Sequence, residues 1–290
     1  MSLLSNHFDH FCLKGWQLWL NKEFPISLNP SVETKLKIEN RKLEIVDGIR
    51  GPVQAIPASD FARVFRGILN FHGAEHRLIL KEYLHRSFVD ILKHLFIPGR
   101  AQRACIASVI LHRHGIPCPP VVALGLKKLG PIPLSSVLLT EEITDAPDIY
   151  AWITQTWLNA GDSVRMIRRQ FIAALGSTIG RMHAAGIAHG DLRPRNILAR
   201  LESGRWTFYL LDNERTRQFR RLPDRLRKKN LHQIGMFPLG VSRTDRWRFF
   251  RAYQTENPAL APRQKPLARS VEAITSARLT RKKSESPLDF

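Results

Sequence analysis

The pattern of apolar and polar positions changes near residue 57. Before it, the aromatic residues of positions 1–23 recur at close to helical spacing, and residues 24–59 are rich in Pro, Asn and Gly. This spacing predicts an amphipathic helix over residues 1–23 that packs on the body of the protein, with a helix resting on a bilayer as the alternative. Strand-like runs then predict two strands, at 62–69 and 77–84, joined by a turn.

Helical patterns and strand-like runs alternate through the rest of the chain. The predicted elements are helices at 88–96, 100–114 and 168–185 and strands at 121–126 and 136–140. Pro98-Gly99 and Gly186 mark the ends of the first and last of these helices. From about residue 256, four prolines and scattered charges predict a flexible tail.

Composition excludes several classes of protein. With 290 residues and 43% hydrophobic residues, the chain can bury the core of one large domain or of two lobes. It contains no run that approaches the roughly 18 apolar residues of a membrane span. The first 20 residues carry charges where a signal peptide is apolar, and the three cysteines are too widely spaced for a CxxC site. We therefore expect a cytoplasmic protein.

The net charge of +20 favours an anionic partner, such as nucleic acid, an anionic membrane face or a phosphorylated substrate. Residues 215–251 concentrate this charge, with twelve Lys and Arg against two Asp. The sequence contains no known nucleic-acid module and no run of interleaved aromatic residues, which makes nucleic acid an unlikely partner.

One constellation carries chemistry. The sequence His189-x-Asp191-x-x-x-x-Asn196 precedes two apolar runs that are joined around Ser203-Gly204, and Asp212 follows the second run. A tight hairpin would therefore return Asp212 to the neighbourhood of Asn196 and Asp191. Phosphoryl transfer needs such a cluster, because one carboxylate orients and deprotonates the attacking hydroxyl while a carboxylate and an amide hold Mg²⁺.

These motifs resemble a known family. HGDLRPRNIL followed by LLDNE resembles the catalytic and metal-binding loops of protein-kinase-like enzymes, in the form found in small-molecule and lipopolysaccharide kinases. KNL at 229–231 and RTDR-x-RF-x-RAY at 243–253 are similar to the C-terminal part of the lipopolysaccharide kinase (Kdo/WaaP) family. The resemblance covers roughly residues 57–253.

The resemblance implies an α+β, bilobal, protein-kinase-like fold with a small sheet-containing N-lobe and a mainly helical C-lobe. The expected divisions are an N-terminal extension at 1–56, the N-lobe at 57–139, a hinge at 140–144, the C-lobe at 145–255 and a flexible basic tail at 256–290.

The resemblance also implies the roles of individual residues. Asp191 resembles the catalytic base, or the residue that orients the substrate hydroxyl, and Asn196 and Asp212 resemble the Mg²⁺ ligands. Lys81 lies where the strand lysine of the family contacts the ATP phosphates. In the hinge, the nucleotide-binding residues would be Glu141 and Ile143. His189 would support the catalytic loop rather than carry a proton.

The implied activity is ATP-dependent phosphorylation of a sugar hydroxyl, on Kdo or heptose, in the lipopolysaccharide inner core. The expected partners are lipopolysaccharide core or another anionic glycolipid, and an anionic membrane surface. The expected location is peripheral, on the cytoplasmic face of an inner membrane. Two alternatives stay open: a kinase of this fold that acts on a protein or small molecule, and a pseudokinase scaffold without transfer activity.

The sequence departs from the protein-kinase pattern at three places. No GxGxxG precedes Lys81, and residues 57–62 (PASDFA) occupy its place. No acidic residue lies between Asp90 and Glu141, so Lys81 pairs either with another partner such as Asp90 or with phosphate alone. Asn213-Glu214 replaces the usual Phe-Gly after the metal-binding aspartate. The missing glycine loop and helix glutamate favour the pseudokinase, whereas the retained Asp191, Asn196 and Asp212 favour transfer.

Overall fold

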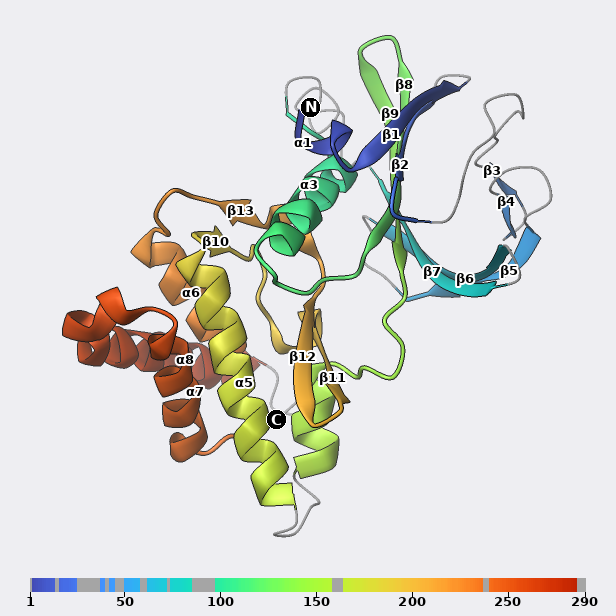
Figure 1. The fold of residues 1–290 in the computed structure, drawn as a ribbon. Coiled ribbons are helices and arrows are strands. Elements are labelled where there is room, and N and C mark those ends of the chain that lie inside the picture. The colour runs from blue at the N-terminus through green and yellow to red at the C-terminus, as the bar shows by residue number, and fades with distance from the viewer. Residues whose placement is uncertain are drawn as a thin grey trace. The chain divides into compact units, whose positions relative to one another are not determined.

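A computed structural model describes residues 2–13, 16–24, 37–39, 42–44, 50–57, 62–71, 74–84, 97–157, 164–236 and 240–285. The chain divides into two compact units (Figure 1). Unit 1 comprises Met1–Val109 and Pro119–Ile143, and unit 2 comprises Ile110–Cys118 and Thr144–Phe290. Each unit is described by itself below.

Unit 1 is built on one antiparallel sheet. Nine strands among the described residues follow the order β1-β2-β8-β9-β7-β6-β5-β4-β3. A short helix, α1 (Ser2–Ser5), precedes them. The strands are β1 (Phe8–Leu13), β2 (Trp16–Asn21), β3 (Lys37–Glu39), β4 (Lys42–Glu44), β5 (Arg50–Ile56), β6 (Ala62–Phe71), β7 (Ala74–Tyr83), β8 (Val121–Leu129) and β9 (Ile132–Glu141).

The helix predicted for residues 1–23 is wrong, because this segment forms the β1–β2 hairpin. Leu13 pairs with Trp16 in its turn, and β2 continues the sheet by pairing with β8. Trp19 is buried on one sheet face and Leu20 on the other. A strand covered on both faces has no polar alternation, and a short apolar run of this kind cannot be told from a helix by its spacing.

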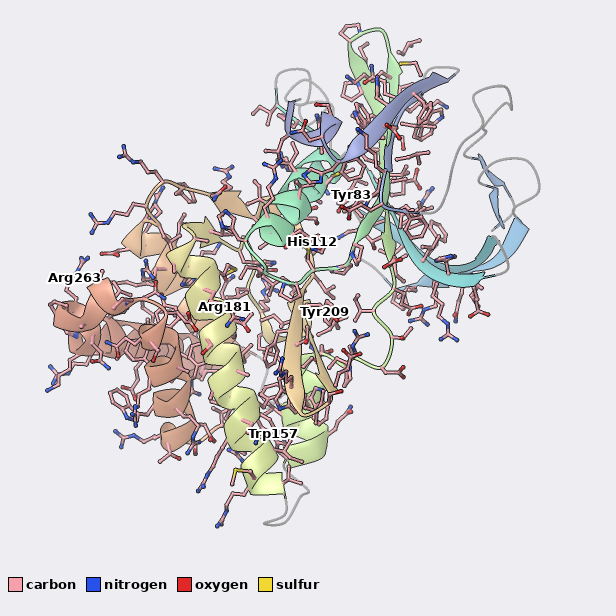
Figure 2. All side chains as sticks on the ribbon, in the orientation of Figure 1. Tyr83, His112, Trp157, Arg181, Tyr209 and Arg263 are labelled. Atoms are coloured by element: carbon pink, nitrogen blue, oxygen red, sulfur yellow. The ribbon has the colours of Figure 1, made fainter. Side chains whose placement is uncertain are left out.

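Helix α3 (Arg100–Arg113) begins in unit 1 and covers one face of the sheet. Its Ala104 and Cys105 are buried in a cluster with Tyr83 of β7 and Leu124 of β8. Tyr83 is labelled beside α3 in Figure 2. The helix predicted at 100–114 and the four strands predicted between 62 and 140 are confirmed. The helix predicted at 88–96 lies outside the described residues.

Unit 2 is mainly helical. Its elements are α4 (Ile149–Ala151), the π-helix η1 (Trp152–Trp157), α5 (Arg165–Ala184), β10 (Ile187–Ala188), η3 (Pro194–Asn196), β11 (Ile197–Glu202), β12 (Arg205–Leu210), η4 (Asn213–Arg215), β13 (Arg217–Gln218), α6 (Asp224–Ile234), α7 (Arg243–Thr255), η5 (Pro258–Arg263) and α8 (Gln264–Glu285).

Helix α5 lies at the centre of the core of unit 2. Its Phe171 is fully buried and packs edge-to-face against Trp157 at 4.9 Å, Trp206 at 4.8 Å and Phe208 at 5.0 Å between ring centroids. Such aromatic pairs stabilise a core beyond their buried area. The β11–β12 hairpin thereby packs against α5, and this contact fixes the place where the chain leaves β12.

The flexible tail predicted after residue 256 is also wrong over most of its length. Residues 258–285 form η5 and α8, with Leu260 and Leu267 buried. Arg263, labelled in Figure 2, pairs with Asp224 of α6 at 3.0 Å. Pro258 and Pro266 lie in the first turns of η5 and α8, where the missing N–H of proline costs little, and Pro262 lies inside the short η5. Pro287 lies outside the described residues.

Unit 2 also contains a mainly apolar cavity of about 380 Å³. Side chains from η1, α5, α6, α7 and α8 line it, among them Trp157, Leu175, Ile234, Phe249 and Val271. In the described part of the chain, no helix combines the length and the apolar character that crossing a membrane requires.

Candidate active site

The predicted catalytic loop connects β10 to β11 in unit 2. The strand β10 pairs with β13, and Leu192 anchors the loop in the core with no exposed surface. Pro194 then starts the short helix η3, because its fixed φ suits the first helical position. Backbone hydrogen bonds from Arg193 N to Asp191 O and from Asn196 N to Arg193 O, both 2.9 Å, close the loop.

The carboxylate of Asp191 is held by three side chains. Its Oδ1 accepts hydrogen bonds from Gln233 Nε2 at 3.0 Å and pairs with Arg193 Nε at 2.8 Å. Asn196 Nδ2 donates to the Asp191 backbone oxygen at 2.9 Å and, more weakly, to Oδ2 at 3.4 Å. The Asp191 side chain is 26% exposed, so a hydroxyl group from solvent can reach a carboxylate that the protein already orients.

The β11–β12 hairpin brings Asp212 back to the catalytic loop, as its sequence predicts. Ser203 and Gly204 both have positive φ, which is the geometry of a tight two-residue hairpin turn. At the other end, Leu211 N donates to Asn196 O at 2.9 Å, and Leu211 O accepts from His189 Nε2 at 2.8 Å. Two hydrogen bonds thus fix the residue immediately before Asp212.

Asp212 itself has left-handed backbone angles, with φ 60° and ψ 45°. Non-glycine residues rarely adopt this conformation, although Asp and Asn tolerate it better than others, and it concentrates at functional sites. Its exposed carboxylate leaves the chain where Asn213 turns inward to bond Leu210 O at 3.0 Å.

His189 supports this loop rather than serving as an acid or base. It is 1% exposed, and its Nδ1 accepts a hydrogen bond from Asp191 N at 3.1 Å while Nε2 donates to Leu211 O. Burial lowers the pKa of His189, although the nearby carboxylates of Asp191 and Asp212 oppose the shift. The imidazole is therefore neutral, and both carboxylates lie within its electrostatic reach.

Gly190 is required by a close approach. A Cβ atom at this position would lie 2.0 Å from Arg215 Cβ, far closer than side-chain atoms can approach. Glycine lets the segment after Asp212 cross directly over the catalytic loop. The HGD sequence therefore has a packing reason for its middle residue.

The donor set of Asn196 and Asp212 fits Mg²⁺. Because Asn196 Nδ2 donates to Asp191, its carbonyl oxygen is the end available as a ligand, and Asp212 adds a carboxylate. Mg²⁺ prefers oxygen ligands and is bound in kinases by one or two protein groups plus water and phosphate oxygens. Within the described ranges, no group of three or more His, Cys, Asp and Glu side chains could hold a metal.

Helix α6 fastens the catalytic loop from behind. Lys229 Nζ donates to Gly190 O at 2.8 Å. Asn230 donates from Nδ2 to His189 O at 2.6 Å and accepts from His189 N at 3.0 Å. Gln233 bridges Asp191 and Leu192 N. The helix therefore contacts the backbone or side chain of four successive loop residues.

A buried chain of hydrogen bonds supports Asn230 in turn. Arg227 Nη1 donates to the Tyr253 hydroxyl, which is 2.9 Å from His183 Nδ1, and His183 Nε2 lies 3.2 Å from Asn230 Oδ1. Burial lowers the pKa of His183 to about 3 and raises that of Tyr253 to about 12. Both groups are therefore neutral near pH 7. The Tyr253 hydroxyl donates to His183 Nδ1, and His183 Nε2 donates to Asn230 Oδ1.

Sequence reasoning used KNL only as a mark of the family and missed Gln233 altogether. The sequence offered one signal for Gln233: polar residues at 227, 230 and 233 recur at a spacing of three and so share one face of a helix. In the structure, this face of α6 is buried. A polar row on the buried side of a helix indicates partners that must be hydrogen-bonded.

The other predicted site residues belong to unit 1. Lys81 lies on β7, where its Nζ is 5.1 Å from the centre of the Tyr83 ring, on the sheet face that α3 covers. Glu141 ends β9 and donates from its backbone N to Pro120 O at 3.0 Å. Ile143 is the last residue of the unit. Their roles in nucleotide binding stay predictions.

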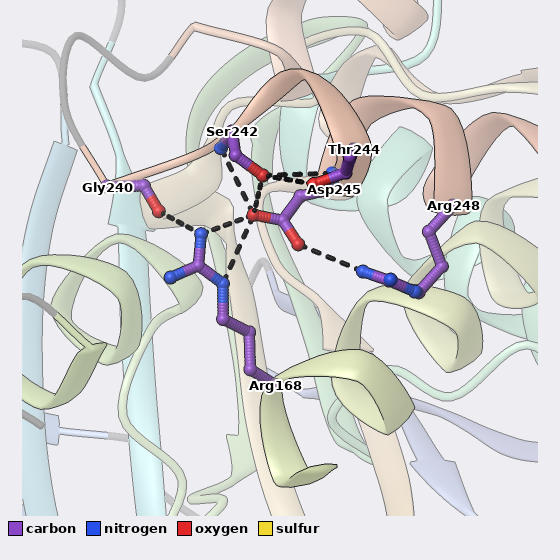
Figure 3. A network of polar contacts seen from close by, with 6 residues as sticks. All are labelled: Arg168, Gly240, Ser242, Thr244, Asp245 and Arg248. Carbon is purple, nitrogen blue, oxygen red and sulfur yellow. Dashed lines mark hydrogen bonds and ion pairs between the residues drawn. The ribbon is translucent and has the colours of Figure 1, made fainter. Parts of the chain in front are cut away.

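Asp245 of the RTDR motif is the centre of a network of polar contacts at the start of α7 (Figure 3). Ser242 and Asp245 make a reciprocal capping box, with Ser242 N to Asp245 Oδ2 at 3.1 Å. Arg168 of α5 bonds both Asp245 and Gly240 O, and Arg248 reaches Asp245 Oδ1 at 3.1 Å. Burial alone would raise the pKa of Asp245, but hydrogen bonds from Arg168 and Ser242 lower it below its usual range.

Some of the basic side chains in residues 215–251 make hydrogen bonds within unit 2, and others extend into solvent. Four of these cations bond groups within unit 2, as Lys229 does with Gly190 O; these are Arg227, Lys229, Arg246 and Arg248. The exposed arginines are Arg215, Arg217, Arg220, Arg221, Arg225, Arg243 and Arg251. Arg215 packs directly on Gly190, so the first members of this exposed group flank the catalytic loop.

Comparisons with known proteins agree with this architecture. The family model for the lipopolysaccharide kinase (Kdo/WaaP) family matches residues 65–253. The lipopolysaccharide core heptose(I) kinase WaaP of Escherichia coli is 28% identical over 201 residues, which cover 65% of this chain and 74% of that protein. The 3-deoxy-D-manno-octulosonic acid kinase of Mannheimia succiniciproducens is 29% identical over 102 residues, which cover 35% and 39%.

A solved structure, WaaP in complex with acyl carrier protein, matches with a TM-score of 0.58 and 21% identity over 77% of this chain and 88% of that chain. This likeness confirms the kinase-like α+β fold. The family model spans well over half of the chain. The protein therefore belongs to the lipopolysaccharide kinase (Kdo/WaaP) family and is a phosphotransferase with an alcohol group as acceptor.

Proposed function

We propose that the protein transfers the γ-phosphoryl group of ATP to a sugar hydroxyl, on heptose or Kdo, of the lipopolysaccharide inner core. The observation that carries this proposal is the gathering of Asp191, Asn196 and Asp212 around the neutral His189. Relatives named as heptose(I) and 3-deoxy-D-manno-octulosonic acid kinases support the class of acceptor.

In this mechanism Asp191 accepts the proton of the acceptor hydroxyl as its oxygen attacks the γ-phosphorus. The bond from the γ-phosphorus to the β,γ-bridging oxygen breaks, and ADP leaves with the electron pair. Asn196 and Asp212 would hold Mg²⁺, which neutralises charge on the phosphates when bound. Lys81 would contribute a further positive charge to the phosphates, and Glu141 and Ile143 would bind the adenine.

The exposed arginines favour an anionic acceptor. Arg215, Arg217, Arg220, Arg221 and Arg225 follow Asp212 along the chain and are exposed to solvent. Near an anionic surface, each basic residue contributes about 1 kcal/mol of attraction. We propose that this segment holds the phosphorylated glycolipid, and that the protein works peripherally on the cytoplasmic face of an inner membrane.

The test is transfer of ³²P from [γ-³²P]ATP, in Mg²⁺, to two purified acceptors: Kdo₂-lipid A and the same lipid extended with heptose. Wild type is compared with Asp191→Asn and Asp212→Asn. Asp9→Asn provides a matched control, because it makes the same chemical change at an exposed residue of β1.

We expect wild type and Asp9→Asn to label one acceptor, and both site variants to lose labelling. The acceptor that is labelled identifies the sugar. No labelling by wild type, or labelling that persists in both site variants, contradicts the proposal. Labelling of a protein or soluble sugar in place of the lipid would indicate a kinase of the same fold with a different acceptor.

A further inference from the structure

The Gln233 side chain is fixed at both ends, although it lies outside the catalytic loop. It is 8% exposed on α6, and its Oε1 accepts from Leu192 N at 3.3 Å and from Asn230 Nδ2 at 3.4 Å. Two N–H donors at one end decide the orientation of the amide. Its Nε2 must therefore face Asp191 Oδ1, which lies 3.0 Å away.

We propose that Gln233 is a positioning residue for phosphoryl transfer, which aims the Asp191 carboxylate at the acceptor hydroxyl. This inference rests on the role proposed above for Asp191. By holding Oδ1, the Gln233 amide sets the rotation of the carboxylate and leaves Oδ2 as the oxygen that takes the proton.

Arg193 contacts the same oxygen but is a weaker constraint. Its side chain is 69% exposed, and exposed ion pairs between flexible side chains restrain geometry little. Gln233, in contrast, is buried on a helix whose Lys229 and Asn230 also bond the loop. A base must be held close to its productive geometry, because a misplacement of about 1 Å can cost about 100-fold in rate.

Two variants separate positioning from simple support of the fold. Gln233→Glu keeps an acceptor for Leu192 N and Asn230 Nδ2 but turns an oxygen toward Asp191 Oδ1, where two carboxylates repel. Gln233→Met keeps the volume and removes every hydrogen bond. If Gln233 only satisfied the backbone of Leu192, the Met variant would lower the unfolding midpoint without a selective loss of kcat.

The experiment measures kcat and KM for ATP in the lipid phosphorylation assay, together with the unfolding midpoint of each variant. Gln254→Glu on α7 is the matched control, because it adds the same charge at a residue outside the loop contacts. We expect both Gln233 variants to lower kcat by about 30- to 100-fold with KM for ATP within about twofold of wild type. The control should match wild type.

The inference is overturned if Gln233→Glu retains kcat within about threefold of wild type, or if KM for ATP rises as much as kcat falls in both variants. The first result assigns Gln233 to backbone support, and the second assigns it to general integrity of the unit. A wild-type protein that labels neither lipid overturns the proposed function, and this inference with it.

Discussion

The network of polar contacts around Asp245, at the start of α7, allows a quantitative prediction. Asp245→Ala removes the carboxylate that joins Ser242, Arg168 and Arg248. The Asp245 side chain is 5% exposed and that of Arg168 is 25% exposed, so the ion pair is mostly shielded from solvent. The change therefore removes the Asp245 half of the capping box, leaves Ser242 as the N-cap, and leaves the partly buried Arg168 without its carboxylate partner.

Two contributions set the magnitude. Loss of the hydrogen bond that Asp245 Oδ2 accepts from Ser242 N costs about 1 kcal/mol. Removing one partner of a buried ion pair costs about 3–5 kcal/mol, and the lower part of this range applies because Arg168 keeps Gly240 O at 2.8 Å and some solvent. We expect Asp245→Ala to lower the free energy of unfolding of unit 2 by about 4 kcal/mol, and the isosteric Asp245→Asn by about 2 kcal/mol.

The assay is equilibrium urea unfolding followed by tryptophan fluorescence, since four of the six tryptophans belong to unit 2. Arg168→Met completes a double-mutant cycle with Asp245→Asn, which isolates the pairwise term. The pKa of Asp245 is lower in the folded state, so its contribution exists above about pH 4 and disappears as the pH falls further. The Asn variant should lack this acid-side dependence.

The reasoning is refuted if Asp245→Ala costs less than about 1 kcal/mol, or if the coupling energy between positions 168 and 245 is below about 0.5 kcal/mol. Either result would mean that α7 is held to α5 by apolar packing alone.

Three further predictions concern the loop and its surroundings. Gly190→Ala should lower kcat by about tenfold or more, because its Cβ would overlap Arg215 and shift the loop beside Asp191. Steady-state kinetics test this, measured at a temperature where the unfolding curve shows that the variant is folded. The pKa of His183 is about 3 in the folded state and near 6.5 in the unfolded state. The free energy of unfolding should therefore be constant above pH 6.5 and fall toward pH 3 by up to about 1.4 kcal/mol per pH unit, because only the unfolded state binds the proton in this range. Urea unfolding of His183→Gln should show a weaker dependence on pH. Joint replacement of Arg220 and Arg221 by Ala should raise KM for the lipid acceptor several-fold at constant KM for ATP, and equal effects on both would contradict an acceptor role.

The catalytic loop could be predicted from the sequence because its geometry is local. Asp191 and Asn196 lie five residues apart, and a two-residue turn at Ser203-Gly204 suffices to return the chain to them. A tight hairpin is sufficient to predict that Asp212 lies next to Asn196 and the catalytic loop. The tasks of these residues in catalysis stay predictions that the labelling assay tests.

The supporting contacts could not be predicted in the same way, because they join distant segments. Gln233 meets Asp191 across 42 positions, and Arg168 meets Asp245 across 77. The N-terminal hairpin was not predicted because its strand β2 is buried on both faces, which removes the alternation that identifies a strand. The helices after residue 256 were not predicted because Pro258 and Pro266 lie in the first turns of helices, where proline is tolerated, whereas composition alone indicates a break.

The cavity in unit 2 bears on how this unit responds to hydrostatic pressure. The cavity measures about 380 Å³, is partly open to solvent and is lined by five helical segments, so only the part of it that excludes water disappears when those helices separate. Unfolding therefore shrinks the total volume of protein and water, by an amount that grows with such voids and is commonly about 20–100 mL/mol. Hydrostatic pressure should therefore lower the stability of unit 2, and the pressure at the midpoint of its unfolding measures this effect.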